Sequence, residues 1–237
     1  MRKKKQRICK RISKSRKKRI YQRNMRIGIV ILLLLTVVAV MVKLVKSGTF
    51  SDQYTENEGD VIERYRPEIE VNLLTTNPYS RPGIETGKIT GVVVHYTANP
   101  GATAMNNRDY FESLKDTHET KVSSNFVIGL EGEIVQCVPT WEVAYASNGR
   151  NNDTVSIECC HPDETGKFND KTYESMVELC AWLCLKFDLK ETDVIRHYDV
   201  TGKNCPKYFV ENEDAWNQFK TEVGEELKSY KRKNFFT

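Results

Sequence analysis

The longest apolar stretch of the chain lies near its amino terminus, at residues 27–46. Residues 27–42 are uncharged, and a helix over 27–45 would measure about 28 Å, close to the hydrocarbon thickness of a bilayer. Residues 1–26 contain fourteen Lys or Arg and no acid. The pattern therefore predicts a single transmembrane helix at 27–46, with the basic tail in the cytoplasm and all later residues on the other side of the membrane.

Two alternatives compete for this amino-terminal segment. A cleaved signal peptide is disfavoured because the basic region is unusually long and no clear small-residue cleavage site precedes Ser47. A nucleic-acid-binding arm is not needed, because membrane topology and anionic lipid already explain basic residues beside an apolar span. We therefore expect an uncleaved anchor and no nucleic-acid partner.

After the apolar run, the pattern of polar and apolar positions changes twice. Residues 47–84 begin polar and acidic and end with a segment, 77–83, that contains Pro78 and Pro82. This pattern predicts an extracytoplasmic linker: a stalk followed by an extended lead-in. From residue 85 to residue 230 short apolar runs alternate with amphipathic stretches, so we place the folded domain there. Residues 231–237 remain as a short tail.

The apolar pattern within the domain predicts strands and helices in alternation. Alternating or continuous short apolar runs predict strands near 89–96, 124–130, 133–138, 154–160 and 193–196. Apolar residues at helical spacing predict three helices, which begin near Asn106 or Asn107, near Asn169 or Asp170, and near Asn212, and end near His118, Phe187 and Ser229. The first is expected to bury Tyr110, Phe111 and Leu114. This order predicts an α/β fold, with a mixed central β-sheet flanked by α-helices.

Net charge and cysteine content further limit the class of protein and the roles of its cysteines. The whole chain has a net charge of +4, but residues 27–237 carry 22 Lys or Arg against 32 Asp or Glu, so the charge is segregated. Seven cysteines without a repeated spacing do not form the disulfide framework of a small secreted domain. Cys180 and Cys184 share the apolar face of a predicted helix, which favours core packing over metal binding. Pairing among Cys137, Cys159 and Cys160 is left open.

Candidate catalytic and metal-binding residues lie on or beside the ends of predicted strands. His197 and Cys205 bracket a loop whose Gly and Pro argue against regular structure, and imidazole with thiolate suits zinc. His95 ends an apolar strand, where a hydrogen-bonded core histidine is the simpler interpretation. Glu158 lies within a largely apolar strand, where an unpaired carboxylate is costly, so it needs a partner or a catalytic role.

Four motifs occur in order: Val-Val-Val-His-Tyr-Thr-Ala at 92–98, Ser-Asn-Phe-Val-Ile-Gly at 124–129, Ser-Ile-Glu at 156–158, and His-x7-Cys-Pro at 197–206. Together they resemble the zinc-dependent N-acetylmuramoyl-L-alanine amidases of the type 2 family, which are related to phage-type amidases and peptidoglycan recognition proteins. The resemblance covers about residues 85–230.

The resemblance implies a zinc site and roles for five residues. His95, His197 and Cys205 would hold one Zn²⁺ per chain, in agreement with the three protein ligands and open position of hydrolytic zinc sites. Glu158 would act as general base and then acid, and Lys203 would lie against the developing oxyanion. A buried ion-pair partner and a surface lysine on a mobile loop are the respective alternatives.

The sequence also departs from the family pattern. Ser124 and Asn125 replace a tyrosine and a histidine of many relatives, and Tyr145 stands where many place a histidine. Tyrosine-assisted catalysis from the first position is therefore not expected. Asn125 and Tyr145 are predicted to line the substrate groove.

The resemblance implies a substrate and a location. We expect a bacterial, single-pass membrane protein whose extracytoplasmic domain hydrolyses the amide between N-acetylmuramic acid and L-alanine in peptidoglycan. Two other functions are considered: a non-catalytic peptidoglycan receptor on the same fold, and a zinc hydrolase acting on some other amide. The sequence does not indicate an oligomeric state.

Overall fold

The computed structural model describes residues 58–233, together with Met25 and Thr36, which are helical. Apart from these two residues, the predicted basic tail (1–26) and transmembrane anchor (27–46) lie outside the described residues, as do residues 47–57 and 234–237. Within the described part of the chain, no helix is both long and apolar enough to cross a membrane.

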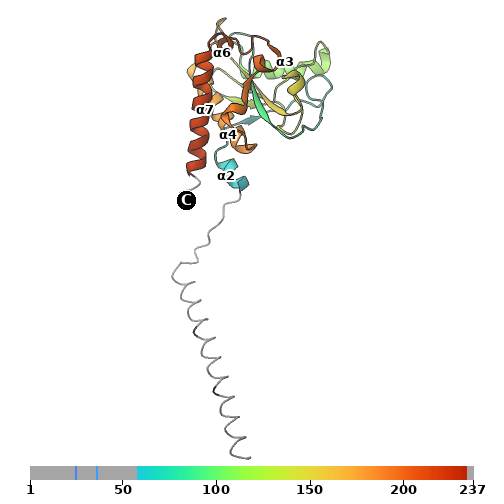
Figure 1. Ribbon diagram of the computed structural model, residues 1–237. Helices are drawn as coiled ribbons and strands as arrows, with labels where there is room; N and C mark the ends of the chain where they lie inside the picture. The colour runs from blue at the N-terminus through green and yellow to red at the C-terminus, as the bar shows by residue number, and fades with distance from the viewer. Residues whose placement is uncertain (1–24, 26–35, 37–57, 234–237) are drawn as a thin grey trace, which may run out of the picture. The chain divides into compact units, whose positions relative to one another are not determined.

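A six-stranded sheet forms the centre of the folded unit (Figure 1). Its strands are β1 (Glu70–Val71), β2 (Gly91–Tyr96), β3 (Phe126–Ile128), β4 (Ile134–Gln136), β5 (Thr154–Cys159) and β6 (Val194–Arg196), in the order β1-β4-β3-β5-β2-β6. β3 and β4 form the predicted antiparallel hairpin, whereas β2 pairs in parallel with both β5 and β6. The prediction of a mixed sheet flanked by helices is confirmed.

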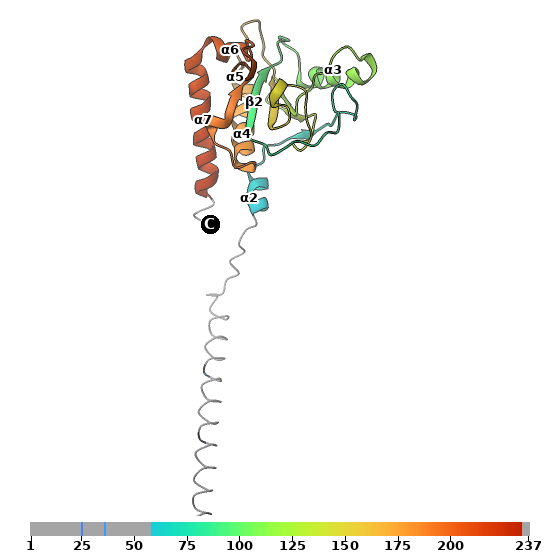
Figure 2. The same cartoon turned by 45° about the vertical axis from the view of Figure 1, so that its right-hand side comes forward.

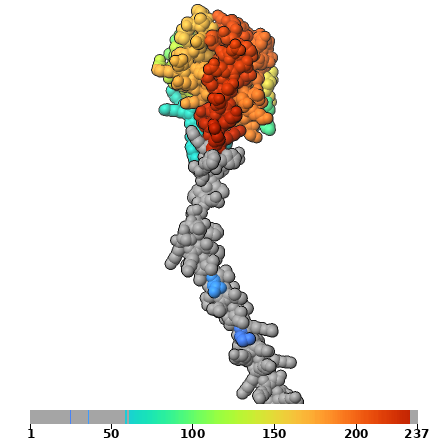
Figure 3. All heavy atoms as spheres, turned by 60° about the vertical axis from the view of Figure 1, so that its left-hand side comes forward, coloured from blue at the N-terminus to red at the C-terminus, as the bar shows by residue number. Residues whose placement is uncertain are grey.

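Helices cover both faces of this sheet (Figures 1 and 2). α4 (Asp170–Lys186) and α7 (Glu213–Lys233) pack on one face, and α3 (Ala104–Thr117) packs on the other. Apolar side chains of β2, β5 and β3 meet the first pair, and Val127 and Val135 meet α3. In the space-filling view, α7 forms a continuous ridge on the surface (Figure 3). Successive side chains along each strand point to opposite faces, so one apolar core lies on each side of the sheet.

The helix α3 differs from its predicted form at two points. Thr103 is its N-cap, and Thr103 and Asn106 exchange the two hydrogen bonds of a capping box, so the helix begins before Asn106. Tyr110, which we expected to be buried, is 45% exposed. By contrast, Asn169 caps α4 as predicted. The cap of α3 was misplaced because Thr and Asn are both strong N-cap residues and local sequence does not choose between them.

Residues 58–84, which we assigned to the linker, contain folded structure. α2 (Glu58–Arg64) contacts α4, where Trp182 donates its indole N–H to the carbonyl of Ile62 at 3.0 Å. β1 pairs in parallel with β4, and Leu74 is 1% exposed. The folded unit therefore begins at α2 rather than at residue 85.

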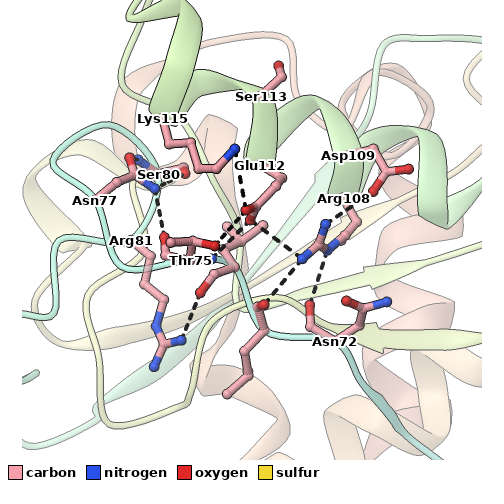
Figure 4. A network of polar contacts seen from close by, with 12 residues as sticks. Asn72, Thr75, Asn77, Ser80, Arg81, Arg108, Asp109, Glu112, Ser113 and Lys115 are labelled. Atoms are coloured by element: carbon pink, nitrogen blue, oxygen red, sulfur yellow. Dashed lines mark hydrogen bonds and ion pairs between the residues drawn. The ribbon is translucent and has the colours of Figure 1, made fainter.

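The lead-in segment also holds α3 in place, through the polar network drawn in Figure 4. The Glu112 carboxylate accepts hydrogen bonds from the backbone N–H and the hydroxyl of Thr75, at 2.9 and 2.7 Å. Arg108 donates to the carbonyls of Asn72 and Leu73. These contacts matter for function because α3 forms one wall of the cavity described below.

The cysteines of the described residues are all buried and free. Cys180 and Cys184 lie in the core that α4 forms with the sheet, as predicted. Cys159 belongs to the same core, whereas Cys137 and Cys160 belong to the core under α3. Cys137, Cys159 and Cys160, whose pairing the sequence left open, are therefore free thiols in this structure.

Arg196, the last residue of β6, joins the end of the sheet to three helical segments, His197–Thr201, Lys207–Glu211 and α7. It is 7% exposed and donates hydrogen bonds to the carboxylates of Asp199 and Glu213, at 2.9 and 2.7 Å, and to the carbonyl of Phe209 at 3.0 Å. Its guanidinium carbon lies 5.3 Å from the ring centre of Trp216. The side chain therefore connects β6 with the start of α7, immediately beside His197.

Replacing Arg196 with methionine is expected to lower the free energy of unfolding by about 2 kcal/mol, because charged acceptors and a buried carbonyl lose their donor. Chemical denaturation measures the change. Lys171→Ala is the matched control, since its ion pair with Glu131 is exposed and should leave the stability nearly unchanged. Equal stability of the two variants would show that the Arg196 cluster does not stabilise the fold.

Candidate metal centre and active site

Three potential metal ligands meet at one edge of the sheet. The strands β2 and β6 are parallel neighbours with Val94 opposite Arg196, so the next residues, His95 and His197, emerge side by side. Their ring centres are 4.6 Å apart. Donor atoms of His95, His197 and Cys205 all lie within 4.8 Å of one another, and all three residues are buried. The structure thus brings together the three residues that the sequence suggested as zinc ligands.

The segment that carries His197 and Cys205 is more ordered than predicted. We expected no regular structure there, but α5 (His197–Thr201) begins at the histidine and lies beside β2 (Figure 2). Gly202 ends the helix with φ 78°, a conformation that glycine adopts without steric cost. The N–H of Tyr198 then donates to the carbonyl of Cys205 at 2.9 Å. The short helix and this hydrogen bond therefore bring Cys205 back beside His197.

The donor set of this cluster fits a zinc ion. His95 uses Nε2 to contact Ser147 Oγ at 3.2 Å, and His197 uses Nε2 to contact Asn148 Oδ1 at 2.9 Å. The other nitrogen of His197, Nδ1, is buried and has no hydrogen-bond partner among the described residues. Nδ1 of His95 lies 3.8 Å from Cys205 Sγ. Two imidazole nitrogens and one thiol are the ligand types that zinc prefers.

The electrostatics of the cluster agree with metal binding. Burial lowers the pKa of His95 well below its usual value, and the charges of His197 and Lys203 add to this effect. Burial, followed by Lys203, also lowers the pKa of His197. Neutral imidazoles keep a lone pair for a metal. Burial raises the pKa of the Cys205 thiol to about 12. A nearby cation is what would hold this sulfur as a thiolate.

Glu158 lies next to the cluster, on the strand β5. It pairs in register with His95, and its Oε1 is 4.0 Å from His95 Nδ1. Its side chain is only 15% exposed, and Oε2 has no hydrogen-bond partner within the described part of the chain. Burial raises its pKa to about 8, although Lys203 acts in the opposite direction. The pKa of the neighbouring His95 lies well below its usual value, which disfavours a charged pair between these two side chains.

A cavity of about 370 Å³ opens at this cluster. All five predicted metal and catalytic residues line it: His95, Glu158, His197, Lys203 and Cys205. Tyr110 and Asn106 of α3 also line it. The tyrosine was missed as a cavity residue because its position within an amphipathic helix predicted burial in the core.

Asn125, predicted to contact substrate, is instead a buried structural residue. It is 1% exposed, and it does not belong to the cavity lining. Its side-chain amide donates to the carbonyl of Pro139 at 3.1 Å, and its Oδ1 accepts from the N–H of Ser156 at 2.9 Å. Because these bonds tie the hairpin region to β5, the amide is not available to a ligand.

Tyr145, the other predicted groove residue, lies beside the cavity rather than in its lining. Its neighbour Ala146 lines the cavity, while the Tyr145 ring faces the ammonium of Lys121 at 5.8 Å. Ser147 and Asn148, which contact the two histidines, were not found from the sequence. They belong to an Asn- and Gly-rich stretch that indicated only irregular structure, without pointing to the metal site.

The N-acetylmuramoyl-L-alanine amidase family, Amidase_2, matches residues 85–208 of the chain. This match covers just over half of the chain. The chain belongs to this amidase family. The matched range contains all five residues that line the cavity at the metal cluster, and it includes the strands β2–β6 that position them.

Curated relatives of this amidase-family chain come from bacilli. The N-acetylmuramoyl-L-alanine amidase CwlL of Bacillus licheniformis is 33% identical over 164 residues, which cover 64% of this chain and 45% of the relative. The amidase BlyA of Bacillus subtilis (strain 168) is 32% identical over 173 residues, with 64% and 46% covered. The chain therefore spans about half the length of the curated relatives that it matches.

Solved structures share the amidase fold. A mutant endolysin from Bacillus subtilis is 26% identical, with a TM-score of 0.57, and the match covers 67% of this chain and all of the endolysin chain. PlyL is 23% identical, with a TM-score of 0.58 and 66% and 97% covered, and at this identity the likeness shows the fold alone. The match thus covers all or nearly all of these two chains and about two thirds of this one.

Proposed function

We propose that this protein is a membrane-anchored, zinc-dependent peptidoglycan hydrolase that cleaves the amide between N-acetylmuramic acid and L-alanine. The observation that carries the proposal is the buried His95, His197 and Cys205 cluster beside Glu158, in a cavity within the matched amidase region. The names of the curated relatives support the choice of bond, since both are N-acetylmuramoyl-L-alanine amidases.

The chain's own residues account for the proton transfers that amide hydrolysis requires. When bound by His95, His197 and Cys205, zinc supplies Lewis acidity and makes a water molecule acidic near neutral pH. Glu158 Oε2 is buried and has no hydrogen-bond partner among the described residues, so the ionised form of Glu158 can take a proton from the attacking water and return it to the leaving nitrogen. Both transfers occur at one carboxylate.

Lys203 is the second chemical group that we assign to the reaction. It is exposed at the cavity, and its ammonium is close enough to lower the pKa of Glu158 against the effect of burial. A positive charge in this place can stabilise the oxyanion that forms as the carbonyl is attacked. The charge also helps to keep the neighbouring histidines neutral.

The membrane anchor rests on the sequence. An apolar run at 27–46 follows a segment with fourteen basic residues and no acid, a pattern typical of a single-pass protein with a cytoplasmic amino terminus. This orientation places the catalytic domain outside the cytoplasm, where peptidoglycan is found. Fractionation of cells and protease accessibility of the domain in spheroplasts test the anchor and its orientation.

The activity is tested with the purified full-length chain and isolated peptidoglycan. We expect new amino termini, with L-alanine as the terminal residue, and no new reducing sugars. A strong zinc chelator should remove the activity and added Zn²⁺ should restore it, because three ligands hold the metal in a site with an open position.

The alternatives predict other results in the same assay. A receptor on this fold would bind peptidoglycan and release no amines. A hydrolase of another amide would cleave small acyl-peptides and leave wall fragments intact. Activity that survives complete removal of metal would contradict the zinc mechanism, even if the bond that is cleaved is the expected one.

A further inference from the structure

Both histidines of the metal cluster are held by one short turn. The 3-10 turn η1 (Asn148–Arg150) follows Ser147. Ser147 Oγ lies 3.2 Å from His95 Nε2, and Asn148 Oδ1 lies 2.9 Å from His197 Nε2. The two histidines come from different elements, β2 and α5, but their Nε2 atoms contact consecutive residues, Ser147 and Asn148.

The turn itself is fixed by hydrogen bonds that do not involve the cluster. Asn151 Oδ1 accepts from the backbone N–H groups of Ala146, at 3.1 Å, and Ser147. The N–H of Arg150 donates to the carbonyl of Ser147 at 3.0 Å. Ser147 is 1% exposed. The backbone that carries Ser147 and Asn148 is therefore held by contacts that do not involve the two histidines.

These bonds decide which nitrogen of His197 carries the proton. An amide oxygen can only accept, so the contact with Asn148 Oδ1 requires N–H at His197 Nε2. The buried Nδ1, which lacks a partner among the residues described, then has the lone pair. The hydroxyl of Ser147 can accept from His95 Nε2 in the same way, which leaves the lone pair of that ring on the Nδ1 that faces Cys205.

The backbone conformation at Asn148 does not by itself require an asparagine side chain. Its φ is 53°, in the left-handed region that glycine and asparagine adopt most readily. Glycine would meet the backbone requirement equally well, and Asn148 is exposed, so core packing does not require the side chain. What asparagine adds is an oxygen that reaches His197.

We propose that Ser147 and Asn148 are positioning residues for the metal centre: they accept the Nε2 protons of His95 and His197 and so leave both Nδ1 lone pairs available to a zinc ion. The inference rests on the proposed function, because it assumes that the cluster binds zinc. Hydrogen-bond partners of metal-bound histidines fix the tautomer and ring orientation, and their loss typically weakens metal affinity by about 10- to 100-fold.

The test measures the zinc affinity of the full-length protein by competition with a chromophoric chelator. Asn148→Gly keeps the backbone conformation and removes the acceptor, so affinity should fall about tenfold or more. Asn148→Asp restores an acceptor of nearly the same shape and should recover wild-type affinity. Ser147→Ala should weaken binding through His95. Gly149→Ala is the control within the turn, since an added Cβ would meet nothing within 4 Å.

The outcomes separate this proposal from the proposed function. If the wild-type protein binds no zinc, the proposed function fails. If the wild type binds zinc and both Asn148→Gly and Ser147→Ala bind it equally well, the positioning role is overturned. Thermal unfolding of the metal-free proteins adds a readout: a large loss of stability in Asn148→Gly that Asn148→Asp does not reverse would make the residue structural and also overturn the proposal.

Discussion

Glu158→Gln is expected to lower the rate of peptidoglycan cleavage by about 100-fold or more while zinc content stays unchanged. Glutamine has nearly the same shape as glutamate but cannot take up and return a proton at neutral pH. Glu158 lies 4.0 Å from His95 Nδ1 and does not belong to the three-residue ligand cluster, so its loss should leave the metal in place. Rates on purified peptidoglycan and metal analysis of the same preparation measure the two effects.

Glu164→Gln is the matched control for this variant, because Glu164 is exposed and lies outside the cavity lining. It should leave both the rate and the zinc content unchanged. An unchanged rate in Glu158→Gln would remove Glu158 from the mechanism. A variant that loses zinc together with activity would instead indicate that the carboxylate supports metal binding.

Cys205→Ser is expected to lose most of its bound zinc and, with it, the amidase activity. A hydroxyl is a much poorer zinc ligand than a thiolate, and two histidines alone leave the site with fewer than the three protein ligands of a hydrolytic centre. Metal analysis after dialysis gives the zinc content, and activity measured with added Zn²⁺ shows whether excess metal compensates.

Cys180→Ala is the control for the thiol, since Cys180 is also fully buried but packs in the core of α4. It should keep its zinc and its activity, with a loss of stability of about 1 kcal/mol. Full zinc occupancy in Cys205→Ser would contradict the assignment of this sulfur as a ligand. The pair of variants therefore distinguishes a metal-binding cysteine from a packing cysteine.

The elements of the domain were largely predictable because periodicity and capping are local. The hairpin of β3 and β4 and the helices α4 and α7 occur close to their predicted places. Three short elements that lack a clear apolar pattern were not predicted: α2, β1 and α5, with seven, two and five residues. Such segments have too few residues for a periodic pattern and are stabilised mainly by contacts with distant parts of the chain.

Asn125 and Asn148 show where local reasoning about the site fails. Both are polar residues near the predicted catalytic region. Asn125 is buried and bonds to Pro139 and Ser156, whereas Asn148 reaches His197, 49 positions further along the chain. The sequence indicates a side chain's chemistry but not its hydrogen-bond partner, so the asparagine that contacts the cluster could be recognised only after folding.

Sequence pattern was enough to locate the longer helices and the central strands and to identify the residue types available for zinc and proton transfer, because both can be read along the chain. It also determined the basic and apolar amino-terminal segments on which the proposed anchor rests. The tertiary structure is needed to bring His95 and His197 side by side and to turn the Nδ1 of His95 toward Cys205. The physical reason is that strand order and register join residues about 100 positions apart, and these depend on packing across the whole sheet.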